Sequence, residues 1–77
     1  MTKYEPLYTF LIGVKETKLT LSYLQIEEIL SNKLPTSAYK YKEWWDNNSH
    51  VQSDSWKMAN FNVCDVVLGE KVTFQKG

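Results

Sequence analysis

The sequence contains no arginine, and all nine of its basic residues are lysines. Arginine is the side chain best shaped for bidentate contacts to phosphate, carboxylate or guanine, so its absence argues against strong nucleic-acid recognition. Nine acidic residues offset the nine lysines, and the formal net charge is zero. No global electrostatic field therefore attracts the protein to nucleic acid or to a membrane surface.

Cysteine is almost as scarce, since Cys64 is the one cysteine in the chain. A single cysteine excludes an intramolecular disulfide and leaves no Cys/His set for a zinc ion. No apolar run approaches the roughly 18 residues of a membrane span, and the start of the chain, MTKYEP, lacks the apolar core of a signal peptide. We therefore expect a soluble cytoplasmic protein with no metal and no cofactor.

Glycine and proline are also few, at three and two residues, whereas 43% of the chain is hydrophobic and 14% is aromatic. This composition indicates a folded protein, because disordered chains combine low hydrophobicity with high net charge. We expect residues 1–77 to form a single domain. Its core is thin, because a chain of this size buries only about 60% of the surface that its unfolded form exposes.

The first half of the chain predicts a helix, a strand and a second helix. The first helix is predicted to begin near Thr2, where TKYE fits a capping box, and to end at Gly13. Its apolar stripe consists of Leu7, Phe10, Leu11 and Val14. The alternation in KLTL (18–21) predicts a short strand with one buried face. In SYLQIEEIL (22–30), Ser22 and Gln25 complete a capping box at the start of the clearest helix.

A third helix is predicted over AYKYKEWWDN, residues 38–47. On a helical wheel, the face directed at the core consists of Ala38, Tyr41 and Trp45. A second stripe beside it consists of Lys40, Trp44 and Asn47. After a polar loop at 47–52, a short helix is expected over 53–59, ended by Asn60, which tolerates the left-handed conformation.

The C-terminal residues NVCDVVLGEKVTFQKG (62–77) predict a β-hairpin around Gly69. A two-residue turn pairs Leu68 with Lys71, whereas a three-residue loop from Gly69 to Lys71 pairs Leu68 with Val72. We prefer the second register, or an equivalent bulge, because it collects the apolar side chains on one face. That predicted buried face consists of Cys64, Val66, Leu68, Val72 and Phe74.

Three helices, a short early strand, an extra short helix and a C-terminal β-hairpin make up the predicted order. These are the parts of a winged-helix-like α+β domain, although other small α+β folds use the same parts.

Several short motifs occur together in the chain: YEPL, IEEIL, LPTSA, WWDN, SHVQ, Trp56 and VTF. This combination resembles a family of short uncharacterised bacterial and phage proteins, and the match extends over nearly the entire chain. The resemblance implies no particular activity. Where that family usually reads A-G-W-x-V after its last tryptophan, this chain reads ANFNV (59–63), and Asn60 can replace a glycine in a left-handed position.

The stretch WWDNNSHVQSDSW (44–56) contains all three tryptophans and the only histidine. Adjacent residues on a helix point about 100° apart, so Trp44 and Trp45 cannot both face the centre of the core. Trp45 and Trp56 are predicted in the core. Trp44 is either a half-buried boundary residue or an exposed stacking platform.

The polar residues of this stretch also have two interpretations. In the first, the asparagines and serines bond to nearby backbone and cap the helix that follows. In the second, Asn47 and Gln52 read an adenine edge, and His50 contacts phosphate.

The lead functional hypothesis is a DNA-binding module that uses the third helix, the polar loop and the C-terminal hairpin, as a homodimer or inside a larger assembly. Lysines alternate with Tyr39 and Tyr41 in a segment without acidic residues, and a lysine marks the hairpin, where phosphate contacts are expected. The predicted nucleic-acid-binding residues are Lys33, Lys40, Lys42, Trp44, Asn47, His50, Gln52 and Lys71.

The alternative hypothesis is a protein-interaction module, such as a phage-borne inhibitor or adaptor of a host defence complex. Neutral charge and an aromatic-rich polar loop suit a protein interface at least as well as a nucleic-acid interface. A continuous positive surface over the third helix and the hairpin favours DNA, and a mixed surface favours protein. No enzyme is expected, because the chain has no phosphate-binding loop, catalytic triad or paired carboxylates at nuclease spacing.

Overall fold

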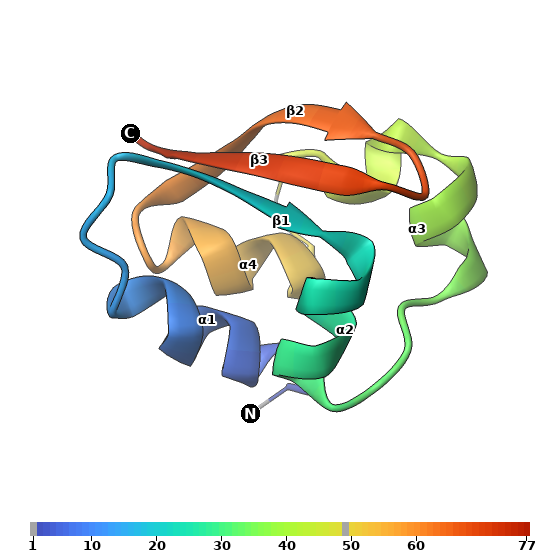
Figure 1. Cartoon of the computed structure of the whole chain (residues 1–77), viewed down its shortest axis with the longest axis horizontal. Coiled ribbons are helices and arrows are strands. Elements are labelled where there is room, and N and C mark those ends of the chain that lie inside the picture. Colours follow the sequence, from blue (N-terminus) through green and yellow to red (C-terminus); the bar gives the residue numbers. More distant parts are fainter. Residues whose placement is uncertain (1, 49) are drawn as a thin grey trace.

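The computed structural model of the chain describes residues 2–48 and 50–77; Met1 and Ser49, the first residue of SHVQ, lie outside the described residues. Its elements are α1 (Glu5–Ile12), β1 (Lys18–Ser22), α2 (Tyr23–Leu30), α3 (Thr36–Lys40), the 3₁₀ helix η1 (Lys42–Trp45), α4 (Val51–Lys57), β2 (Phe61–Val67) and β3 (Lys71–Lys76). Figure 1 shows α1, α2 and α4 on one side of the sheet, and α3 beside the turn between β2 and β3. The protein is a small α+β domain, as predicted.

The sheet has three antiparallel strands in the order β1–β3–β2, so the C-terminal strand lies in the centre. Leu21 of β1 pairs with Val72 of β3, and both side chains are buried. On the opposite face, the hydroxyl oxygens of Thr20 and Thr73 lie 3.0 Å apart. The predicted alternation in KLTL is therefore confirmed.

The hairpin forms around Gly69, but its register differs from the preferred one. Val67 pairs with Lys71 and Val66 with Val72, so the three loop residues are 68–70 rather than 69–71. Gly69 has a φ of 77°, which favours glycine because it has no Cβ. Gly69 is the middle residue of the three-residue loop, and a loop centred on it pairs Val67 with Lys71.

A β-bulge in β2 changes which residues of the strand face the core. Val63 pairs with Phe74 and Asp65 pairs with Thr73, so Cys64 is the extra residue between them. Cys64 is exposed. The prediction of a buried Cys64 was wrong, because the bulge removes this residue from the inward-facing series.

Helix α1 begins later than predicted. The Oγ1 of Thr2 accepts a hydrogen bond from the N–H of Tyr4, 3.3 Å away, and the helix starts at Glu5. The buried face consists of Tyr4, Leu7 and Leu11. Phe10 is exposed, because it lies about 100° from Leu11 on the helix and falls at the edge of this face.

Helix α2 follows its sequence signal closely. The N–H of Gln25 donates to Ser22 Oγ at 3.0 Å, and the N–H of Ser22 donates to Gln25 Oε1 at 2.8 Å. This is the predicted capping box, which satisfies two backbone donors at the start of the helix. Tyr23, Ile26 and Leu30 of this helix are buried in the core.

The third helix predicted over residues 38–47 was wrong as a single element. It is interrupted at Tyr41, whose φ of −125° and ψ of 125° are extended. In a continuous helix, the carbonyl of Ala38 would accept from the N–H of Lys42. Here that carbonyl accepts instead from the Tyr23 hydroxyl at 2.6 Å and from Trp45 Nε1 at 3.0 Å. The break changes the helical phase, so Ala38 and Trp45 are buried but Tyr41 is 56% exposed.

Candidate functional site

Two of the three tryptophans form the centre of the core. Trp45 and Trp56 are fully buried and stacked, with ring centroids 5.8 Å apart and an interplanar angle of 24°. Trp56 also meets the ring of Phe74, on the central strand, edge to face at 5.8 Å. The prediction that Trp45 and Trp56 belong to the core is confirmed.

Trp44 is half-buried at the boundary of this cluster. Its ring contacts Trp45 at 4.7 Å and Tyr4 at 5.8 Å, both nearly perpendicular. This geometry fits the first interpretation of Trp44, a half-buried residue at the boundary of the core. The Tyr4 contact joins the 3₁₀ helix η1 to the start of α1.

The side chain of Asn47 pairs with the backbone of β2. Its Oδ1 accepts from the Val63 N–H at 2.9 Å, and its Nδ2 donates to the Val63 carbonyl at 2.9 Å. The same Oδ1 accepts from Trp56 Nε1 at 3.0 Å. One amide therefore occupies part of the outer edge of β2, as a neighbouring strand would, and also satisfies a buried indole. These bonds correspond to the structural interpretation of the loop.

Other polar residues of the stretch WWDNNSHVQSDSW form hydrogen bonds around the start of α4. Gln52 is half-buried, and its Nε2 donates to the carbonyl of Trp44 at 3.2 Å. The buried Ser53 hydroxyl accepts from the His50 N–H at 2.9 Å and bonds to the carbonyl of Asn48. Because these bonds form ahead of Ser53, the helix begins at Val51, earlier than predicted. The His50 side chain is exposed.

The four predicted lysines lie around one end of the domain. All are exposed: Lys33 before α3, Lys40 at its end, Lys42 at the start of η1 and Lys71 at the start of β3. The hairpin turn meets α3 there, since a Cβ added to Gly69 would lie 3.9 Å from the ring of Tyr39. Glu43 follows Lys42 and Glu70 precedes Lys71. The charge at this end is therefore mixed rather than continuously positive.

Glu27 and Tyr39 form a bonded pair at the same end. The Tyr39 hydroxyl donates to Glu27 Oε2 at 2.7 Å, and the Leu34 N–H donates to the same oxygen at 2.9 Å. The hydrogen bond from Tyr39, then the one from Leu34 and the charge of Lys33, lower the pKa of Glu27. The bond to Glu27 raises the pKa of Tyr39 to about 12. This pair anchors the segment between α2 and α3.

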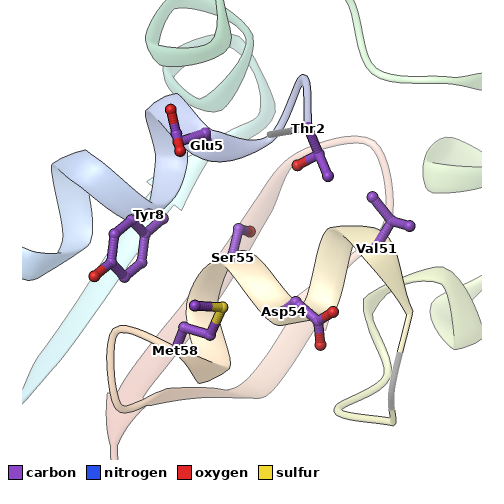
Figure 2. Close-up of a pocket in the computed structure, with 7 residues that line it drawn as sticks. All are labelled: Thr2, Glu5, Tyr8, Val51, Asp54, Ser55 and Met58. Carbon is purple, nitrogen blue, oxygen red and sulfur yellow. The ribbon is translucent and has the colours of Figure 1, made fainter.

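A groove between α1 and α4 has a volume of about 260 Å³ and is more enclosed than the larger hollow of about 430 Å³ beside Glu27 and Tyr39. Its lining consists of Thr2, Glu5, Tyr8, Val51, Asp54, Ser55 and Met58. In Figure 2 the two helices run side by side, with Thr2 and Val51 at one end, Tyr8 and Met58 at the other, and Ser55 between them. Glu5 and Asp54 lie on opposite walls.

Two exposed apolar side chains border this groove. Val51 is 54% exposed and Met58 is 72% exposed. Val51 begins α4 and Met58 is its C-cap, seven positions later, so the two side chains share one face of the helix, opposite the face that buries Trp56. Exposed apolar side chains that border a concave surface are typical of binding sites in soluble proteins.

This groove was not predicted from the sequence. Val51 was assigned to the loop because the helix was predicted to begin at Ser53, so its spacing to Met58 carried no information. The sequence signal that indicates this face is the helical spacing, at positions i, i+3, i+4 and i+7, of Val51, Asp54, Ser55 and Met58.

Fold and surface together define a small α+β domain with an apolar groove between two helices. The chain belongs to the family described as "Domain of unknown function (DUF7662)", which matches residues 4–77. This agrees with the resemblance to an uncharacterised family. The search of the curated proteins and the search of the solved structures each gave no match. None of the helices formed by residues 2–48 and 50–77 combines the length and apolar character that crossing a membrane requires.

Proposed function

We propose that this domain is a protein-interaction module whose binding site is the α1–α4 groove. The observation that carries the proposal is the exposure of Val51 and Met58 beside a groove that Tyr8 also lines. Covering apolar surface contributes about 25 cal/mol per Å² to association, so a partner that covers Val51 and Met58 gains binding free energy at the groove. At about 260 Å³, the groove is smaller than the roughly 300–1,000 Å³ of typical small-molecule sites, which favours protein side chains as its occupants.

The order of elements is consistent with a winged-helix-like scaffold. Without α3 and η1, the chain runs helix, strand, helix, helix, strand, strand, and its sheet order is β1–β3–β2. We interpret α3 and η1 as an insertion, so that α4 takes the place of the helix that enters the major groove in DNA-binding relatives of this scaffold. The exposed residues of α4 and its C-cap are Val51, Asp54, Lys57 and Met58. This face is apolar with one charge of each sign, which favours a protein partner over phosphate.

Site-specific photo-crosslinking tests the proposal. A photoreactive amino acid at Thr2, on the rim of the groove, is expected to give a discrete protein adduct in extract of the cells that carry the protein. The same amino acid at Thr20, on the opposite face of the sheet, serves as the control. Adding Met58→Lys should abolish the Thr2 adduct. Equal adducts from both positions, or an adduct that survives Met58→Lys, would contradict the proposal.

DNA binding is the second candidate, favoured by the exposed lysines around α3 and the hairpin. Fluorescence anisotropy with duplex DNA at roughly 50 mM salt tests it, since binding through a few lysines must weaken as salt rises. If this candidate is correct, the Lys40→Ala, Lys42→Ala double variant loses affinity while Met58→Lys retains it. Absence of binding at low salt removes the candidate.

A further inference from the structure

The walls of the α1–α4 groove determine the shape of its occupant. Val51 to Met58 covers about two turns of helix, roughly 10 Å. The apolar groups are divided between the two ends, with Val51 at one end and Tyr8 and Met58 at the other. Two apolar side chains about 6 Å apart fit between these two ends, and a short amphipathic helix presents such a pair at positions i and i+4.

The charges of the walls determine the chemistry of the occupant. The seven lining residues include Glu5 and Asp54 and no lysine. The nearby ammonium of Lys3 is directed at Tyr4, at 5.5 Å from the ring centroid. Because the two carboxylates stand on opposite walls, they complement positive charges on both sides of an apolar stripe.

We infer that the groove binds a basic amphipathic segment of another protein, with two apolar anchors bordered on each side by lysine or arginine. On a helix with anchors at i and i+4, residues i+1 and i+3 flank the stripe on opposite sides and carry the positive charges. This inference rests on the proposed function and adds the class of partner. Acidic or neutral amphipathic segments bind less well, so the carboxylates select among apolar partners.

Three labelled synthetic peptides of about four helical turns test the inference. All share two leucines at i and i+4, and they carry lysine, glutamine or glutamate at the flanking positions. Anisotropy titrations with the intact protein are expected to give a dissociation constant at least about tenfold lower for the lysine peptide than for the glutamate peptide. Added salt should reduce this preference.

Matched variants separate the roles of charge and apolar surface. The Glu5→Gln, Asp54→Asn variant should reduce the preference to less than about twofold, since the exposed carboxylates supply it. The control, Glu28→Gln with Asp65→Asn, removes the same charge from exposed positions elsewhere and should keep the preference. Met58→Lys should abolish binding of all three peptides, and circular dichroism checks that each variant is folded.

The outcomes distinguish this inference from the proposed function. If all three peptides bind equally and Met58→Lys abolishes binding, the groove is an apolar interaction site and the inference of a basic partner is wrong. If the lysine peptide does not bind, the inference is overturned, whereas the crosslinking at Thr2 judges the proposed function separately. Self-association that Met58→Lys abolishes, without peptide binding, would also overturn it, because the occupant would then be a second copy of the chain.

Discussion

Replacing Asn47 by alanine is expected to destabilise the domain far more than its exposed position suggests. The side chain makes three hydrogen bonds, two with the backbone of Val63 at 2.9 Å and one with Trp56 Nε1 at 3.0 Å. Alanine removes all three. Because β2 is an edge strand, no other strand can replace the lost partner of Val63.

The bond with Trp56 contributes most of the expected loss. The Trp56 side chain is fully buried, and an unsatisfied buried donor costs about 1–3 kcal/mol. The groups of Val63 lie at the strand edge, where water can replace the amide, so each loses only about 0.5 kcal/mol. Together these losses amount to about 2–4 kcal/mol. In a domain of this size they lower Tm by roughly 8–32 °C.

Urea unfolding followed by tryptophan fluorescence, with thermal unfolding followed by circular dichroism, measures the effect. Asn48→Ala is the matched control, because the hydrogen bond that the described residues show for the Asn48 side chain is an exposed one to Asp46, with Nδ2 at 2.8 Å from Oδ2. The control should lose no more than about 0.5 kcal/mol. Asn47→Asp keeps the two accepting interactions but sets an oxygen against the Val63 carbonyl, so it should remain destabilised. If Asn47→Ala costs no more than Asn48→Ala, the side-chain amide is not acting as a strand partner and the reasoning is refuted.

Three further predictions concern two hydrogen bonds and one backbone conformation. Tyr39→Phe should raise the pKa of Glu27 toward its ordinary 4.5. A lowered carboxyl pKa stabilises the fold above the unfolded value and loses this contribution as pH falls, so the difference in urea midpoint between wild type and variant should shrink below pH 4.5. Asn60→Gly should be neutral within about 0.5 kcal/mol, whereas Asn60→Val should cost about 1–2 kcal/mol in chemical denaturation, because the φ of Asn60 is 66°. Tyr23→Phe should cost about 1–2 kcal/mol by the same assay, because the buried hydroxyl donates to the Ala38 carbonyl at 2.6 Å.

The features that the sequence predicted are those with local causes. The capping box of Ser22 and Gln25 involves residues three positions apart, and both of its bonds form as expected. Asn60 and Gly69 have positive φ because each stands where a helix or a strand must end. Such signals depend on the nearest neighbours in the chain, so a single sequence contains them.

The features that the sequence did not predict depend on distant residues. At the break at Tyr41, the carbonyl of Ala38 accepts a hydrogen bond from the hydroxyl of Tyr23, which belongs to another element. The outward position of Cys64 follows from the pairing of β2 with β3, which a periodic pattern alone does not determine. The groove depends on α1 lying beside α4, and no signal within Glu5 or Met58 indicates that they share it.

The tryptophans and the polar residues of WWDNNSHVQSDSW have one physical cause. A thin core filled with indole rings must also supply acceptors for their N–H groups, because an unsatisfied buried donor is costly. Among the described residues, every buried side-chain nitrogen or oxygen has a hydrogen-bond partner, and Asn47 provides the one for Trp56.

Under the proposed function, α4 and its C-cap separate folding from recognition, since Trp56 is buried on one face while Val51 and Met58 are exposed on the other. Substitution on each face should therefore change one property only. Met58→Lys should alter stability by no more than about 0.5 kcal/mol while abolishing partner capture. Asn47→Ala should lower stability while leaving affinity unchanged at temperatures where the variant is folded. If either substitution changed both properties together, the two faces of α4 would not be independent, and the groove could not be assigned to recognition.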